Sequence, residues 1–141
     1  MDYLEFELIS PDRTLLKSKV WKVILPTSQG QITVLSKHIP LITKLIPGEV
    51  IIQKTQSARE YCVITGGFAE ITGKKVRILA DAAEHAQDID EAKAEKAKRN
   101  AQKIIRETKN QVEFNEANAA LERAIARLKV ARKHKGSRHN F

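Results

Sequence analysis

The chain has 141 residues, 42% hydrophobic and 30% charged, which suffices for one ordinary domain or a small domain with an appendage. Its net charge of +8 is uneven: residues 1–84 hold 11 basic and 9 acidic residues, and residues 85–141 hold 14 and 8. The single cysteine excludes an internal disulfide framework. No apolar run approaches the roughly 20 residues of a membrane-spanning helix, and the acidic N-terminus is unlike a secretion signal. We therefore expect a soluble protein in a reducing compartment.

The hydrophobic pattern changes at Val76–Glu91. Before this stretch, apolar and polar residues mostly alternate, which is typical of half-buried strands; after it, apolar residues recur every three or four positions, as on amphipathic helices. Asp88 with Glu91 three positions later is a helix-start signature. The sequence therefore predicts a β module over residues 1–84, joined without a long linker to a helical module over residues 85–141.

Within the β module, strand-like runs follow one another at intervals of about ten residues. The first run is Leu4–Leu8, and the turn-forming residues Ser10–Arg13 follow it. The other expected strands are Val20–Leu25, Gln31–Leu35, Leu41–Leu45, Glu49–Lys54, Glu60–Thr65, Gly67–Ile71 and Lys75–Ala80. Turn-rich segments separate them, so the pattern predicts a β-sandwich or a barrel.

The sequence contains no recognisable catalytic or metal-binding constellation. Its four histidines have no ligand-like spacing and there is no cysteine pair, so we expect no metal site. The glycines of Gly66–Gly67 and Gly73 do not form a P-loop, because five residues separate Gly67 from Gly73 and a second lysine follows Lys74. We expect no catalytic residues, and an enzyme with an unrecognised site is kept as an alternative.

The helical module is expected to contain two helices. The first runs from a cap at Asp88 to about Lys109, with an inner stripe of Ala94, Ala97, Ala101 and Ile104. The second follows a turn at Asn110–Gln111 and has an inner stripe of Phe114, Ala117, Leu121, Ala124, Leu128 and Ala131. Helices joined by so short a loop pair antiparallel. A buried methyl contributes only about 0.8 kcal/mol, so this hairpin is a candidate for undocking or extension, with permanent docking as the alternative.

Basic residues gather near the C-terminus. From Arg123 to Phe141 there are seven basic residues and no acidic residue, and Arg123 and Arg127 share a helix face. A solvated surface and a docking surface for an acidic or phosphate-bearing partner both fit this pattern. A nucleic-acid-binding module that uses the basic C-terminal helix is therefore an alternative function. It leaves the β module unexplained, and no aromatic stacking residues accompany the basic run.

Several short motifs occur in a fixed order along the chain: S-P-D-R at Ser10–Arg13, G-Q-I-T-V-L-x-x-H-I-P-L at Gly30–Leu41, P-G at Pro47–Gly48, G-G-F-A-E-I at Gly66–Ile71, V-R-I-L-A-D-A-A-E at Val76–Glu84, D-I-D-E at Asp88–Glu91 and A-A-L-E-R-A-I-A-R-L at Ala119–Leu128. Together they resemble the epsilon subunit of the bacterial F-type ATP synthase across essentially the whole chain. The resemblance implies a flattened β-sandwich followed by an antiparallel two-helix hairpin. It also implies a non-catalytic subunit of the central stalk, peripheral to the cytoplasmic face of the plasma membrane, that couples proton flow to ATP synthesis.

The resemblance further implies protein partners and no nucleic acid. In that family the sandwich grips the gamma subunit and touches the ring of c subunits through a loop that corresponds to Gln31–His38. The candidate contacts are Gln31, Lys37 and His38, with Ser36-Lys37 in place of the usual Pro-Gly. The hairpin can extend along gamma toward the catalytic alpha and beta subunits, where basic residues meet an acidic segment and slow ATP hydrolysis. The matching positions here are Arg123, Arg127, Lys129 and Arg132.

Some bacterial members of the family bind regulatory ATP in the compact hairpin through an I/L-D-x-x-R-A motif and arginines of the second helix. The corresponding residues of this chain are Ile89, Asp90, Lys93, Ala94, Arg123 and Arg127. Lys93 replaces the arginine of the motif; lysine keeps the charge but loses the planar fork that can hold two acceptors. We therefore expect weak regulatory ATP binding and no required cofactor.

Overall fold

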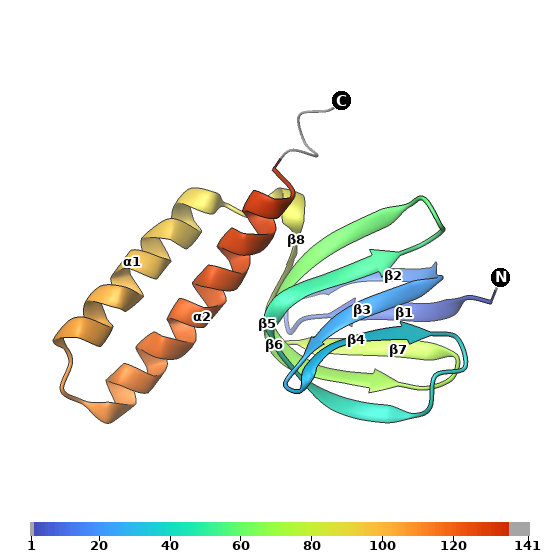
Figure 1. Cartoon of the computed structure of the whole chain (residues 1–141), viewed down its shortest axis with the longest axis horizontal. Coiled ribbons are helices and arrows are strands. Elements are labelled where there is room, and N and C mark those ends of the chain that lie inside the picture. Colours follow the sequence, from blue (N-terminus) through green and yellow to red (C-terminus); the bar gives the residue numbers. More distant parts are fainter. Residues whose placement is uncertain (1, 136–141) are drawn as a thin grey trace. The chain divides into compact units, whose positions relative to one another are not determined.

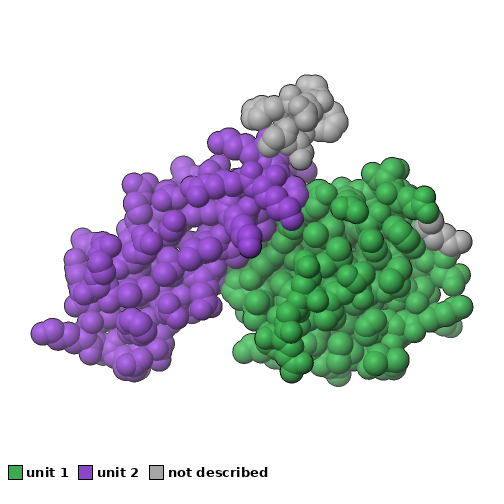
Figure 2. Space-filling model, viewed as in Figure 1, with its two compact units in different colours: residues 1–85 green, residues 86–141 purple. Residues whose placement is uncertain are grey.

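The computed structural model describes residues 2–135 and divides the chain into two compact units, residues 1–85 and residues 86–141 (Figures 1 and 2). The first unit is built from strands and the second from helices. The predicted fold class, a β-sandwich followed by a two-helix hairpin, is confirmed. The last residues of the basic tail, 136–141, lie outside the described part of the chain.

The strands of the first unit form one folded-over sheet in the order β2-β1-β7-β6-β5-β3-β4, with β8 paired to β6 (Figure 1). All neighbours are antiparallel except β1 and β7, which are parallel. The strands are β1 (Leu4–Ile9), β2 (Thr14–Val20), β3 (Lys22–Thr27), β4 (Gly30–Leu35), β5 (Leu41–Gln53), β6 (Arg59–Ile71), β7 (Lys75–Ala80) and β8 (Ala83–His85). The sequence pattern did not predict β2 or β8.

The central hairpin of the sheet consists of β5 and β6, which are 13 residues long each. Four separate strands were expected over these residues, and that prediction was wrong. The turn-forming residues bend the strands without interrupting their pairing, because Leu45 remains paired with Gly67 and Pro47 with Thr65. Gly67 has φ +140°, and a Cβ there would collide with the carbonyl oxygen of Leu79. Glycine is therefore required where β6 bends against β7.

Alternating side chains fill the interior of the sandwich. Leu4, Phe6 and Leu8 of β1 are completely buried, while Glu5 and Glu7 between them face outward. The core also takes up residues of every long strand, among them Val20, Val23, Leu25, Val34, Leu45, Val50, Ile52, Cys62, Ile64, Ile71, Val76 and Ile78. Cys62 is thus a core residue, as its strand-like surroundings predict.

The second unit consists of a short 3₁₀ turn, η1 (Ala86–Asp88), and two helices, α1 (Glu91–Glu107) and α2 (Gln111–Lys133). Asp90 caps α1, since its carboxylate accepts a hydrogen bond of 3.1 Å from the backbone N–H of Lys93. The predicted cap at Asp88 was wrong by two residues, because D-I-D offers two aspartates and Asp88 lies inside η1. Neither helix is long and apolar enough to cross a membrane, as far as the chain is described.

The two helices pair along a seam lined mainly by alanine. The buried residues of the seam are Ala94 and Ala101 of α1 and Ala117, Ala124, Leu128 and Ala131 of α2. Ala97, Ile104 and Phe114, also expected there, are exposed. The inner stripe of α1 instead continues through the half-buried Lys98 and Ile105, because the long aliphatic stem of a lysine can cover apolar surface.

Candidate functional site

An exposed apolar surface lies on the outer side of β5, β6 and β7. It consists of Ile42, Ile46, Phe68 and Leu79, which are 76%, 42%, 56% and 52% exposed. Pairing brings them together, since Phe68 lies opposite Leu79 on one side and opposite Lys44, between the two isoleucines, on the other. We call these four residues the apolar face. Exposed apolar side chains gathered in this way commonly mark a protein-binding surface.

The segment Gln31–His38 is a strand followed by a tight turn. Gln31 lies at the beginning of β4, opposite Pro26, whereas Lys37 and His38 follow the end of that strand. Gln31 and Leu35 alone are about 13 Å apart at the rise of a strand. The structure therefore places Lys37 and His38 together and Gln31 at the other end of β4.

Lys37 occupies a backbone conformation that usually belongs to glycine. Its φ is +70°, and its N–H donates a hydrogen bond of 2.7 Å to the carbonyl of Gly73 in the β6–β7 turn. The Lys37 ammonium group lies 3.5 Å from the carboxylate of Asp2, and both side chains are largely exposed. Leu35 and Ile39, on either side of this turn, are exposed as well. This end of the sandwich thus presents apolar side chains beside a cation.

The basic residues of α2 differ in their surroundings. Arg123 and Lys129 are exposed, whereas Arg127 is half-buried and contacts other residues of the chain. Arg132 is bound to α1: its Nε donates to Glu91 and its Nη2 to Glu95, both at 3.0 Å. The hydrogen bond from Arg132 lowers the pKa of Glu91. Of the four expected partner contacts, Arg132 is therefore already paired inside the second unit.

The residues expected to bind ATP are only partly brought together. Ile89 is buried, and the Asp90 carboxylate is occupied as the cap of α1. Lys93 is exposed. It lies between Glu91 and Glu95 in sequence, and because both carboxylates bind Arg132, Lys93 lies beside the C-terminal end of α2. Along α2, Arg127 lies about 7.5 Å and Arg123 about 13.5 Å from Arg132 at 1.5 Å per residue. The motif residues at the beginning of α1 adjoin one another, and Arg123 lies about two and a half helical turns away from them.

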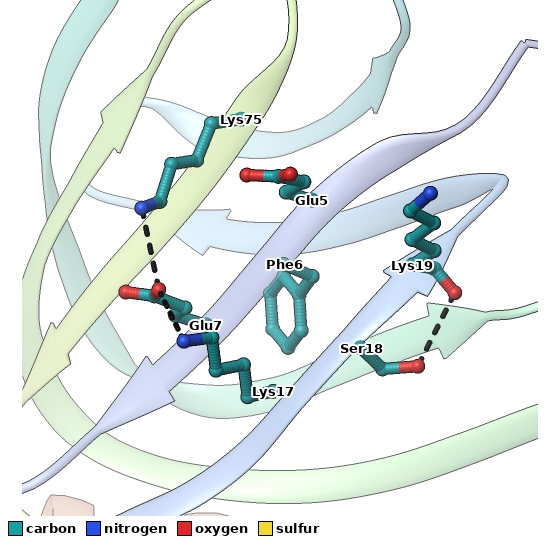
Figure 3. A pocket seen from close by; sticks show the side chains of 7 residues that line it. All are labelled: Glu5, Phe6, Glu7, Lys17, Ser18, Lys19 and Lys75. Carbon is teal, nitrogen blue, oxygen red and sulfur yellow. Dashed lines mark hydrogen bonds and ion pairs between the residues drawn. The ribbon is translucent and has the colours of Figure 1, made fainter.

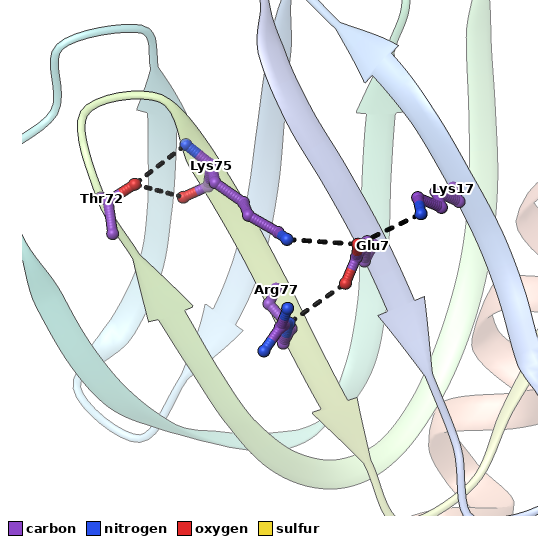
Figure 4. Close-up of polar contacts among 5 residues, drawn as sticks. All are labelled: Glu7, Lys17, Thr72, Lys75 and Arg77. Carbon is purple, nitrogen blue, oxygen red and sulfur yellow. Dashed lines mark hydrogen bonds and ion pairs between the residues drawn. The ribbon is translucent and has the colours of Figure 1, made fainter.

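A charged hollow lies over β1, β2 and β7 and was not anticipated from the sequence. It is lined by Glu5, Phe6, Glu7, Lys17, Ser18, Lys19 and Lys75 (Figure 3). Three cations surround the carboxylate of Glu7, which lies 3.2 Å from Lys75 Nζ, 3.1 Å from Arg77 Nε and 3.9 Å from Lys17 Nζ (Figure 4). The partners are distant in sequence, so only knowledge of the strand pairing could have revealed them.

The surroundings of Glu7 favour its ionised form. The hydrogen bond from Lys75, with that from Arg77, lowers the pKa of the Glu7 carboxyl despite its partial desolvation. A carboxylate held ionised by neighbouring cations is a poor proton donor or acceptor near neutral pH. The cluster is therefore better suited to tying β1 to β2 and β7 than to catalysis.

The cysteine of the β-sandwich contacts a histidine. Cys62 Sγ lies 3.6 Å from His85 Nδ1, where β8 pairs with β6. Between residues 2 and 135, the structure contains no group of three His, Cys, Asp or Glu side chains that could hold a metal ion.

Two family models together match nearly the whole chain. The ATP synthase delta/epsilon chain β-sandwich domain matches residues 3–86, and the long α-helix domain of the same chain matches residues 87–132. The chain belongs to the ATP synthase delta/epsilon family. The boundary between the two matched domains falls one residue after the division between the two structural units.

Bacterial epsilon chains are similar to this family member over almost its full length. It is 43% identical to the ATP synthase epsilon chain of Syntrophobacter fumaroxidans over 131 residues, covering 92% of this chain and 96% of that one. The Moorella thermoacetica epsilon chain is 40% identical over 131 residues, with 93% and 98% covered. The resemblance to a bacterial epsilon subunit is confirmed.

Solved structures share the fold of this family member. A chain in the Euglena gracilis mitochondrial ATP synthase, determined with OSCP, F1 and the c-ring, superposes with a TM-score of 0.80 at 23% identity. The match covers 89% of this chain and 79% of that chain. A chain of the central stalk and c-ring assembly of Tetrahymena thermophila gives a TM-score of 0.68 at 14% identity, covering 91% and 96%.

The Glu7 cluster gives a prediction about stability and pH. Glu7→Gln should lower the melting temperature at pH 7 by a few degrees, because three cations lose their common counter-charge. Since the pKa of Glu7 is lowered in the folded protein, its contribution is complete above the usual value of 4.5 and is lost as the pH falls through the folded-state pKa. Thermal unfolding of both proteins between pH 3 and pH 7 measures the difference.

The matched control is Glu5→Gln, which removes an exposed carboxylate from the same strand face. It should change the melting temperature little at any pH. A difference between wild type and Glu7→Gln that stayed constant down to pH 3 would contradict the assigned role of Glu7.

Proposed function

We propose that this chain is the non-catalytic epsilon subunit of the central stalk of a proton-translocating F-type ATP synthase, where it couples proton flow to ATP synthesis and restrains ATP hydrolysis. The observation that carries the proposal is the match of both units, in order, to the two domains of the delta/epsilon family. The nucleic-acid alternative is not retained, because it leaves the β-sandwich without a role. The protein joins the membrane through the complex, and we assign it to the cytoplasmic face of a bacterial plasma membrane.

We assign the apolar face to the gamma subunit. It gathers four exposed large apolar side chains on three adjacent strands of the first unit, and Phe68 of β6 lies between those of β5 and β7. An aromatic anchor in an apolar patch is typical of strong protein–protein contacts. The end of the sandwich that carries Lys37 and His38 is assigned to the c-ring, whose acidic groups Lys37 could meet.

Phe68→Glu tests the assignment of the apolar face. A carboxylate at this position would be desolvated in the complex without a partner, so gamma binding should weaken by a factor on the order of 100. Titration calorimetry with the purified gamma subunit, or co-purification from the assembled enzyme, measures the loss.

The control is Thr33→Glu, which adds the same charge at an exposed strand position outside the apolar face. It should bind gamma as tightly as the wild type does. If Phe68→Glu folds normally and binds equally well, gamma uses another surface.

We assign the exposed cations of α2 to an acidic segment of the catalytic subunits, reached when the hairpin extends. Arg123 and Lys129 point into solvent in the folded hairpin and are available for such a contact, and Arg127 shares the face of Arg123. Arginine can hold a carboxylate through two parallel hydrogen bonds, which makes the pair strong and directional. Restraint of hydrolysis then depends on charge complementarity.

Neutralising Arg123 and Arg127 together to alanine should weaken inhibition of ATP hydrolysis by about tenfold, since two charge-assisted contacts are removed. Hydrolysis by the enzyme reconstituted with each variant measures the effect. The double variant Arg99→Ala/Lys103→Ala removes the same charge from exposed positions of α1 and should inhibit normally. Equal inhibition by all three proteins would exclude the assignment.

We further propose a weak regulatory ATP site at the beginning of α1, in which Lys93 contributes a cation and Arg127 a second one along α2. Lys93→Arg should tighten ATP binding by about tenfold, because it restores the planar fork of the family motif. Calorimetry of the isolated chain with millimolar ATP measures binding to both proteins. The absence of detectable heat from either protein would refute the site.

A further inference from the structure

The helical hairpin has one end closed by covalent linkage and one end closed by ion pairs. The connection through Thr108–Asn110 joins the helices at the first end. At the other end, the guanidinium of Arg132 reaches across from α2 to α1 and uses separate nitrogens for Glu91 and Glu95, both at 3.0 Å. Lys135 adds a longer contact of 3.7 Å to the second oxygen of Glu91. Three charged contacts thus converge on the open end of the hairpin.

The apolar seam alone holds this end weakly. Near Arg132 it consists of Ala94, Leu128 and Ala131, so few methylene groups are buried per helical turn. Single exposed ion pairs stabilise proteins little, but here one guanidinium bridges two carboxylates in a network. The helix termini reinforce it, because Glu91 lies at the positive end of the α1 dipole and Arg132 at the negative end of the α2 dipole.

We propose that Arg132 is the latch of the helical hairpin: it fastens the last turns of α2 to the first turns of α1, and the hairpin opens when Arg132 releases Glu91 and Glu95. The role differs from that of Arg123 and Lys129, which face solvent while the hairpin is closed. The latch depends only on contacts inside the second unit.

Release has a chemical requirement. Nε of Arg132 carries a single hydrogen, which it donates to Glu91, so an external carboxylate that forms a bidentate pair with the Nε and Nη2 edge of the guanidinium must displace Glu91. An acidic partner therefore competes with α1 for one side chain, and binding it is coupled to opening the hairpin. This coupling, unlike the latch itself, rests on the proposed function of α2.

Amide hydrogen exchange of the isolated full chain, followed by NMR, tests the latch. Undocked helices of this length are marginal in water, so exchange at the seam reports opening of the hairpin. Arg132→Gln should accelerate exchange in the first two turns of α1 and the last three turns of α2 by about three- to tenfold, and leave the β-sandwich unchanged. Sodium chloride at about 0.5 M should produce the same change in the wild type and little further change in the variant.

Two further variants make the outcome specific. Arg99→Gln removes the same group from an exposed position of α1 that makes no ion pair within residues 2–135, and should exchange like the wild type. Arg132→Glu, which brings three carboxylates together, should open the hairpin further, and adding Glu95→Arg should recover part of the protection. Wild-type exchange rates in Arg132→Gln would overturn the latch. Faster exchange with unchanged inhibition of hydrolysis would preserve the latch and reject its coupling to a partner.

Discussion

The pairing of β5 with β6 organises the first unit. This hairpin stays in register from Leu41 opposite Ile71 to Gln53 opposite Arg59, and every other strand except β1, β2 and β4 pairs directly with it. Gly66 and Gly67 give β6 two residues of positive φ in the middle of this ladder, and the pairing continues on both sides of them. The same hairpin supplies most of the apolar face and, through β6, the partner for β8, from which the chain continues into the helical unit. The core, the apolar face and the position of β8 therefore all depend on the pairing of β5 with β6.

Local periodicity predicted the fold class, whereas the details that depend on pairing across the chain could not be predicted. Alternation identified the buried face of β1, and the change of period near Val76–Glu91 located the passage from strands to helices. Pro47 and Gly67 were read as parts of turns and were expected to end strands. The prediction failed because the same residue types also occur where a strand bends and keeps its hydrogen bonds. Ala97 was wrongly placed in the inner stripe of α1 for a similar reason. This helix carries alanines on its buried and on its exposed face, and the residue type alone does not separate them.

The basic residues of α2 could be predicted from the sequence in part, whereas the Glu7 cluster and the apolar face could not. Motif order indicated the family, and the helical spacing of Arg123 and Arg127 indicated a shared face. Sequence did not separate Arg132 from these residues, because its carboxylates lie 37 and 41 positions away. The Glu7 cluster and the apolar face were missed because their members come from different strands. Charge and exposure are properties of the assembled surface, and each residue by itself is unremarkable in sequence.

The turn at Lys37 has a consequence for how a charge is presented. A glycine would adopt φ +70° without cost, whereas a side chain in this region costs about 1–3 kcal/mol. The hydrogen bond from Lys37 to Gly73 fastens two neighbouring loops and helps to offset that strain. The backbone from which the Lys37 side chain leaves is thus fixed by a hydrogen bond to the neighbouring turn, while the ammonium group itself stays exposed. An acidic partner at this end of the sandwich would therefore meet a cation whose point of attachment to the backbone is held by the hydrogen bond to Gly73.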